Sequence, residues 1–116
     1  MIKLKRIYEG YDEQDGFRIL IDRLWPRGIT KEDAHLDLWL KEIAPSNELR
    51  KSFHQENISW EDFKKRYLLE LSAKKDLLEE IRQAEKENPV VTLLFGAKDL
   101  RQNQAVIIAE VLKEHA

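Results

Sequence analysis

The feature that most constrains the fold is a continuous apolar run near the C-terminal end of the chain. Residues 90–95 read Val-Val-Thr-Leu-Leu-Phe, with β-branched side chains at the start and a glycine directly after. A run of this length is typical of a central strand that is buried on both faces. Such a strand needs a covering layer on each side, so the sequence predicts helices on both faces of a sheet.

Two further strands are expected near the N-terminus. Residues 2–8 alternate between apolar and basic side chains, and residues 17–21 read Phe-Arg-Ile-Leu-Ile. Residues 9–16 between them are acidic and contain two glycines, which is typical of a loop. The order of elements is then strand, strand, helical region, strand and helix. This order favours a small α/β layered fold with a partly parallel sheet flanked by helices.

The helical region spans residues 29–89 and would form an elaborated crossover between strands. Ser46 and Ser59 precede acidic residues and are expected to cap helices. A last helix is expected from about Leu100 to Lys113. The first helix of the region is predicted from four apolar residues at helical spacing, namely Leu36, Trp39, Leu40 and Ile43.

Length and composition bound the class of protein. The chain has 116 residues, which predicts one α/β domain over residues 1–116. Its formal net charge is −2, so binding of nucleic acid through bulk positive charge is not expected. It has no cysteine, which excludes disulfides, thiolate metal sites and cysteine nucleophiles. No membrane-spanning run or signal peptide is recognised, and we expect a cytoplasmic protein.

Polar segments follow two of the predicted strands directly. Residues 22–28 read Asp-Arg-Leu-Trp-Pro-Arg-Gly, and residues 96–103 read Gly-Ala-Lys-Asp-Leu-Arg-Gln-Asn. Ligands of open α/β sheets bind beyond the carboxyl ends of the strands. If the two strands are parallel neighbours, both segments meet at one edge of the sheet. The sequence therefore predicts a pocket between them.

The residue types in this predicted pocket suit an anionic small molecule, either phosphorylated or carboxylated, or a nucleotide. Arginine recognises phosphate and carboxylate through two parallel hydrogen bonds, and a tryptophan can stack on a planar group. Asp22, Asp99 and His54 are the candidate acids or bases. The candidate ligand-binding residues are Arg23, Trp25, Arg27, Arg50, Lys98 and Asn103.

A purely structural interpretation stands beside the functional one. Asp22 could form an internal ion pair with Arg23 or Arg27, and the Trp25 ring could fill the core. Asp99 with a glutamine three residues later resembles a capping box. His54 lies where a helix is expected to end, a position at which histidine commonly interacts with the helix dipole. The residues alone leave both interpretations open.

The sequence indicates neither a metal site nor a particular cofactor. It contains no His-Glu-x-x-His motif, no EF-hand pattern and no glycine-rich phosphate-binding loop. It also does not specify a reaction, so whether the predicted pocket is enzymatic stays open.

Several segments together resemble one known family. They are the heptapeptide at residues 22–28, Trp-Leu-Lys-Glu-Ile-Ala-Pro-Ser at 39–46, Phe53-His54 and Ala97-Lys98-Asp99. The chain is similar over nearly its whole length to the YeaO-like branch of the domain-of-unknown-function-488 family. The resemblance implies a compact α/β domain in a bacterial or archaeal cytoplasmic protein and supplies no activity. The chain departs from the family at Gln104, where many members have His, and Gln104 is not among the candidates.

Two hypotheses of function follow. The first is a small-molecule anion or nucleotide site at the strand ends, with or without catalysis. The alternative is a non-enzymatic module that binds a protein or a nucleic acid through Trp25 and the neighbouring basic residues. The alternative predicts an exposed Trp25 with arginine side chains that point outward. The sequence does not indicate an oligomeric state.

Overall fold

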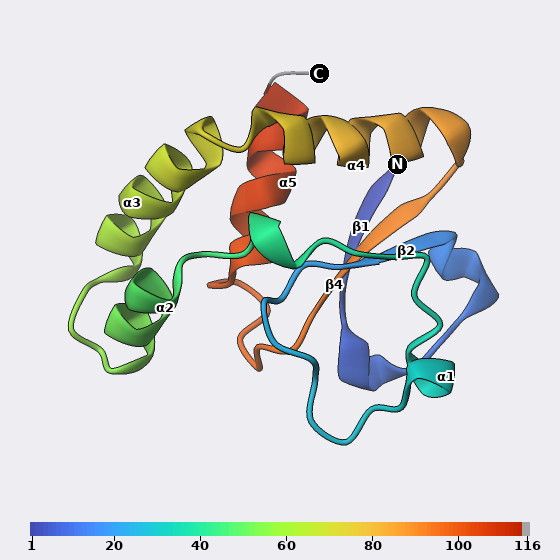
Figure 1. The fold of residues 1–116 in the computed structure, drawn as a ribbon, viewed down its shortest axis with the longest axis horizontal. Coiled ribbons are helices and arrows are strands. Elements are labelled where there is room, and N and C mark those ends of the chain that lie inside the picture. The colour runs from blue at the N-terminus through green and yellow to red at the C-terminus, as the bar shows by residue number, and fades with distance from the viewer. Residues whose placement is uncertain (115–116) are drawn as a thin grey trace.

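A four-stranded parallel sheet forms the centre of the molecule (Figure 1). The computed structural model describes residues 1–114. All five residues of β4 are buried, because this strand pairs with β1 on one side and with β2 on the other. The α/β fold and the central strand predicted from residues 90–95 are both confirmed. In sheet order the strands are β1 (Ile2–Arg6), β4 (Val91–Phe95), β2 (Phe17–Leu20) and β3 (Leu38–Trp39).

Most of the helical structure lies in the long connection between β2 and β4. Both predicted caps are confirmed, because Ser46 Oγ accepts a hydrogen bond from the Leu49 N–H and Ser59 Oγ accepts one from the Asp62 N–H. Within residues 1–114, no helix is long and apolar enough to cross a membrane. The helices are α1 (Lys31–Ala34), α2 (Asn47–His54), α3 (Trp60–Ser72), α4 (Lys75–Glu87) and α5 (Gln104–Glu114).

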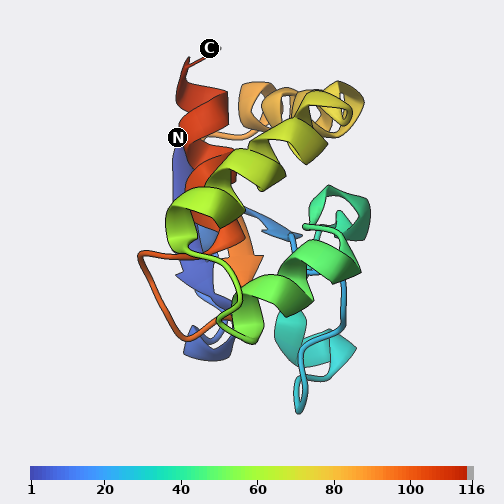
Figure 2. The same cartoon turned by 90° about the vertical axis from the view of Figure 1, so that its left-hand side faces the viewer.

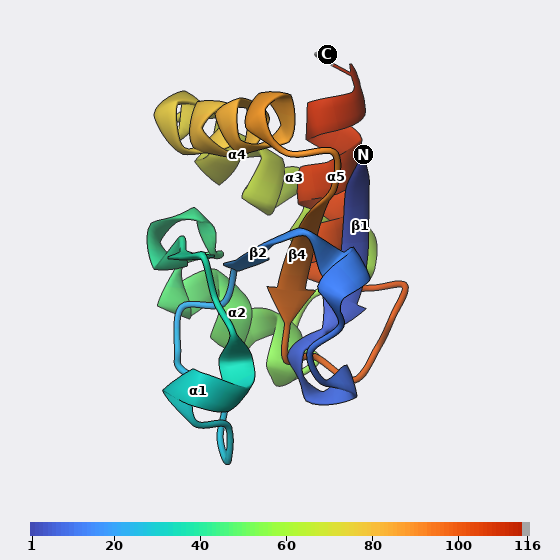
Figure 3. The ribbon, with the colours of Figure 1, turned by 90° about the vertical axis from the view of Figure 1, so that its right-hand side faces the viewer.

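The two faces of the sheet are covered differently. Val91, Leu93 and Phe95 face a large apolar core that also contains side chains of α2, α3, α4 and α5 (Figure 2). Leu94 faces a smaller cluster with Ala34 of α1 and the partly buried Trp25. Figure 3 shows α1 and the irregular chain before it on this second side. A one-turn helix and a loop therefore replace the full helical layer that the buried strand led us to expect.

A buried ion pair completes the second face. The Arg18 side chain of β2 is only 1% exposed, and its guanidinium contacts the Asp15 carboxylate. It also donates hydrogen bonds of 2.9 and 3.2 Å to the Ala34 carbonyl at the end of α1. Lys5 Nζ donates to Asp15 as well, at 3.0 Å. Polar groups thus hold α1 against the sheet where its few apolar side chains could not.

The helix predicted from Leu36, Trp39, Leu40 and Ile43 is wrong. Residues 38–39 instead form the short edge strand β3, and residues 41–43 form a single 3-10 turn. The Asp37 N–H donates to the Arg18 carbonyl at 2.9 Å, and the Leu40 N–H donates to the Leu20 carbonyl at 2.9 Å. Pairing with the free edge of β2 satisfies these backbone groups, so tertiary contacts override the local helical pattern.

Candidate functional site

The predicted meeting of the two strand ends is confirmed. Leu20 of β2 pairs with Leu94 of β4 in parallel register, so the chain leaves both strands at the same level. Asp22 lies just beyond β2, and its Oδ2 accepts a hydrogen bond of 2.8 Å from the backbone N–H of Gly96. The two carbonyls after β4 are occupied as well, because Arg6 donates hydrogen bonds to the oxygens of Gly96 and Ala97.

A cleft of about 320 Å³ opens at this edge of the sheet. Its wall comes from five parts of the chain: the turn after β1, the segment after β2, the turn before α2 together with α2 itself, helix α3, and the segment after β4 up to the first residue of α5. The polar or charged side chains of the lining belong to Tyr8, Asp22, Arg23, Arg50, His54, Gln102, Asn103 and Gln104. The remaining lining residues are Leu24, Trp25, Pro26, Ala44, Pro45, Phe53, Phe63, Gly96 and Ala97.

Asp22 is the ionisable group at the base of the cleft. Burial of its carboxylate raises the pKa of Asp22 to about 6, although hydrogen bonds from Gly96 and Gln104 and the charge of Arg50 act in the opposite direction. The Gln104 bond joins Nε2 to Oδ1 at 2.5 Å. Asp22 forms no ion pair with Arg23 or Arg27, so the structural alternative considered for this carboxylate is wrong.

Arg50 places a guanidinium in the same cleft from the first half of α2. Its Nε atom is buried and has no hydrogen-bond partner among residues 1–114. The charge of Arg50 acts on Asp22, but the two side chains form no ion pair within 4.0 Å. No hydrogen bond or ion pair links the terminal guanidinium nitrogens of Arg50 to residues 1–114 either, and these nitrogens, unlike Nε, are open to solvent. They are therefore the atoms of Arg50 that an acceptor in the cleft can reach.

Arg23 has a structural position at the rim of the cleft. Its guanidinium donates to the carbonyls of Ala44 at 3.1 Å and Pro45 at 3.4 Å, and it lies 3.5 Å from the Glu42 carboxylate. Two residues of α3 fix the same turn from the other side. The Tyr67 hydroxyl donates to Ile43 O at 2.7 Å, and Glu70 accepts hydrogen bonds from the N–H and the hydroxyl of Ser46.

Trp25 and His54 both line the cleft, but their environments differ. The Trp25 ring is half-buried, and its indole N–H donates to the Ile29 carbonyl at 2.6 Å. It meets Trp39 edge to face, with ring centroids 5.3 Å apart. His54 is exposed at the last residue of α2. It borders the mouth of the cleft, whereas Arg50 one turn earlier lies deeper.

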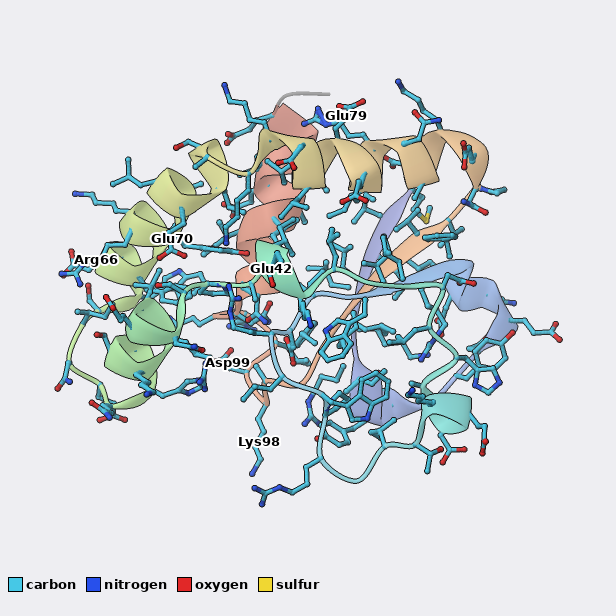
Figure 4. All side chains as sticks on the ribbon, viewed as in Figure 1. Glu42, Arg66, Glu70, Glu79, Lys98 and Asp99 are labelled. Atoms are coloured by element: carbon cyan, nitrogen blue, oxygen red, sulfur yellow. The ribbon has the colours of Figure 1, made fainter. Side chains whose placement is uncertain are left out.

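The structure does not bring Arg27, Lys98 or Asp99 into the cleft. All three side chains are exposed, and Lys98 extends away from the ribbon in Figure 4. The Arg27 carbonyl accepts a hydrogen bond from the Tyr8 hydroxyl, so this residue contacts a lining residue through its backbone alone. Asp99 Oδ1 accepts from the N–H groups of Arg101 and Gln102, which hold the pKa of Asp99 below its usual value. The expected grouping of these three residues with Asp22 is therefore corrected.

Asn103 lines the cleft and also caps α5. Its Oδ1 accepts from the Val106 N–H at 3.2 Å, and its Nδ2 donates to the Asp99 carbonyl at 2.8 Å. The helix therefore begins at Gln104 rather than near Leu100. Because both ends of the Asn103 amide are used within the protein, it shapes the wall of the cleft rather than offering a free group.

We expect Asn103→Ala to lower the free energy of unfolding by about 1–2 kcal/mol, because the change removes a helix cap and a second buried hydrogen bond. Urea unfolding followed by circular dichroism measures this loss. Asn103→Asp keeps an acceptor for the Val106 N–H and should recover part of it. An unchanged midpoint in the alanine variant would contradict the capping role.

Three polar cleft residues, Tyr8, Gln102 and Gln104, were not among the candidates from the sequence, and of these Gln104 contacts Asp22. The predicted helix start near Leu100 places Gln104 inside the helix, whereas the observed start makes it the first residue, directed at Asp22. The one signal in the sequence was the departure from the resembled family at this position. Phe53 and Phe63 of the apolar wall were not predicted either, since aromatic residues at helical spacing indicate core packing equally well.

The comparisons with known proteins support one family. A family model described as the inactive DUF488-N3 subclade matches residues 1–116. The chain belongs to the DUF488 family. Its expected likeness to the YeaO-like branch is confirmed by YeaO of Escherichia coli K12, which is 46% identical over 112 residues, 97% of this chain and 96% of YeaO.

More distant relatives in this DUF488 family come from mycobacteria. Rv3073c of Mycobacterium tuberculosis H37Rv and Mb3100c of Mycobacterium bovis are each 35% identical over 111 residues, covering 96% of this chain and 92% of the relative. All three relatives are described as uncharacterized proteins, so their names carry no activity. No solved structure matches the chain.

Proposed function

We propose that this DUF488 chain binds a small anionic molecule in the cleft at the strand ends, without converting it chemically. The observation that carries the proposal is Arg50, which lines an open cleft although its guanidinium has no hydrogen-bond or ion-pair partner within residues 1–114. Arginine is the side chain best suited to carboxylate and phosphate groups. The N-terminus of α5, whose dipole favours negative charge, borders the same cleft.

Binding without catalysis is favoured by the composition of the cleft lining. Among the described lining residues there is no serine, threonine, cysteine or lysine, so the side chains left for covalent catalysis are those of Tyr8, Asp22 and His54. The side-chain partner of Asp22 is the Gln104 amide, which neither accepts nor gives up a proton near neutral pH. The description of the matching subclade as inactive supports the same proposal.

The alternative of a docking module for a protein or nucleic acid is less well supported. That hypothesis requires an exposed Trp25, whereas the ring is half-buried and its N–H is already bonded to Ile29. Of the basic residues assigned to such a surface, Arg23 already donates hydrogen bonds to the Ala44 and Pro45 carbonyls at the rim of the cleft. We therefore retain the small-molecule site as the proposed function.

Ligand-dependent unfolding tests the proposal. We expect at least one of acetate, benzoate, inorganic phosphate and AMP to raise the unfolding temperature in a saturable manner, because a ligand that binds only the folded state stabilises it. Arg50→Gln should abolish this rise. Arg66→Gln, which changes an exposed arginine on the outer side of α3 (Figure 4), is the matched control and should leave it intact.

Two results would contradict the proposed function. If none of the four anions shifts the unfolding temperature, or if Arg50→Gln leaves the shift unchanged, the assigned site is wrong. If mass spectrometry after incubation finds the bound compound converted into a new product, binding without conversion is wrong.

A further inference from the structure

The size of the cleft limits the ligand, given the proposed function on which this inference rests. Pockets for drug-sized ligands measure about 300–1,000 Å³, and this cleft of about 320 Å³ lies at the lower end of that range. A compound of one ring with one charged group fits this space. A dinucleotide or a polymer would have most of its surface outside the cleft.

The charges of the cleft limit the ligand further. Two guanidinium groups line it, but that of Arg23 is occupied by carbonyl oxygens and by Glu42. Arg50 is therefore the cation left for a ligand among the described lining residues, and Asp22 supplies a carboxyl group nearby. A monoanion needs only one guanidinium. A phosphate dianion would set two negative charges against one cation and beside a carboxylate, which disfavours it.

The apolar part of the cleft wall indicates a ligand with an apolar group, not a small ion alone. The Phe53 and Phe63 rings lie with centroids 4.6 Å apart, and both border the cleft together with Trp25 and Pro45. Leu24 at the mouth is 62% exposed. Aromatic rings pack well against one another in tilted and stacked arrangements, so a flat ring would cover this wall and exclude water from it.

We propose that the ligand is a small aromatic monocarboxylic acid, whose carboxylate is held by the Arg50 guanidinium and whose ring lies against the Phe53 and Phe63 wall. The planar carboxylate can accept two parallel hydrogen bonds from the two terminal nitrogens of the guanidinium. The ring accounts for the apolar lining, and the single negative charge accounts for the single available cation. This assignment replaces the broader class of phosphorylated molecules and nucleotides considered from the sequence.

Isothermal titration calorimetry with four probes tests this assignment on the 116-residue chain. Benzoate has both a carboxylate and an aromatic ring, and acetate has the carboxylate without the ring. Inorganic phosphate and AMP have a phosphate group in place of the carboxylate. We expect benzoate to bind at one site and to bind more tightly than acetate, phosphate or AMP. Arg50→Gln should weaken benzoate binding by about 10- to 100-fold, the usual effect of losing a charged hydrogen-bond partner. Arg66→Gln should not change it.

A measurement on the unaltered protein tests the same contact without depending on whether the Arg50→Gln variant folds. The Arg50 Nε–H signal in a ¹H–¹⁵N NMR spectrum should shift on addition of benzoate, because the carboxylate binds the terminal nitrogens of the same guanidinium. The Arg23 Nε–H already donates to the Pro45 carbonyl, so its signal is the internal reference and should shift less than that of Arg50.

The possible outcomes separate this inference from the proposed function. Benzoate binding that depends on Arg50 and exceeds acetate binding supports both. If phosphate or AMP binds more tightly than benzoate and Arg50→Gln removes that binding, the aromatic acid is wrong while the anion site stands. Equal binding of acetate and benzoate would contradict the role of the apolar wall. If none of the four probes binds, both proposals are wrong. Both are also wrong if a probe binds equally well to the Arg50→Gln variant and does not shift the Arg50 Nε–H signal of the native chain.

Discussion

Arg18→Ala is expected to lower the free energy of unfolding by about 3–5 kcal/mol, the usual cost of removing one partner of a buried ion pair. The Arg18 side chain is 1% exposed and makes two hydrogen bonds to the Ala34 carbonyl. Alanine would leave that carbonyl and part of the Asp15 carboxylate without partners and would open a cavity under α1. Urea unfolding at neutral pH, followed by circular dichroism, measures the loss.

Two variants make the Arg18 result specific. Arg66→Ala removes an exposed arginine and should change stability by less than about 0.5 kcal/mol. Arg18→Met fills most of the same volume, while Asp15 keeps its hydrogen bonds from Lys5 and the Asp12 N–H, so it should lose less than the alanine variant. A loss below about 1 kcal/mol for Arg18→Ala would show that the buried ion pair does not hold α1 on the sheet.

Arg18 also illustrates what the sequence could not predict. In the sequence it is a charged residue inside an apolar strand, which alternation would place on a solvated face. It is buried because the second face of the sheet carries a loop and a one-turn helix instead of a long amphipathic helix. Arg18 pairs with Asp15, which lies in a segment that the sequence identifies only as an acidic loop. Nothing in the sequence distinguishes Asp15 from the other acidic residues of that loop.

The predictable parts of the molecule are those fixed by local chemistry or by sheet topology. The β4 strand follows from residues 90–95, and the serine caps follow from side-chain hydrogen bonding to the first helical turn. The contact between Asp22 and Gly96 follows because parallel neighbouring strands end at the same edge.

The unpredictable parts depend on how irregular segments turn. Arg27 and Lys98 are near the right strand ends, yet both side chains are exposed and neither lines the cleft. Arg50 was predicted and does line the cleft, because a regular helix fixes the direction of its side chain. Topology thus locates the candidate site, while tertiary contacts decide which cations face it.

Asp22→Asn is expected to raise the free energy of unfolding above pH 7 by about 2 kcal/mol. Burial raises the pKa of Asp22 from 3.8 to about 6, so between these values the folded protein holds a proton that the unfolded chain releases. The contribution of this group to stability is therefore full below about pH 4 and is lost as the pH rises through 6, at a rate of at most about 1.4 kcal/mol per pH unit. Asparagine is neutral throughout and keeps an acceptor for the Gly96 N–H, and its NH2 group can donate to Gln104 once the Gln104 amide turns to present its oxygen.

The gain from Asp22→Asn should consequently vanish as the pH falls to about 4, where the native carboxyl is also neutral in the folded protein. The difference between the unfolding free energies of the variant and the native chain at each pH removes the contribution of other titrating groups. Asp15 is one of these groups, and its pKa is lowered because hydrogen bonds from Lys5, Asp12 and Arg18 outweigh its burial. Asp99→Asn, at an exposed carboxylate that caps backbone N–H groups, should give no gain at any pH. An Asp22→Asn variant that is equally or less stable above pH 7 would contradict the raised pKa. A carboxylate that destabilises its own fold, set beside the buried Arg50 Nε, is typical of a site maintained for binding rather than for stability.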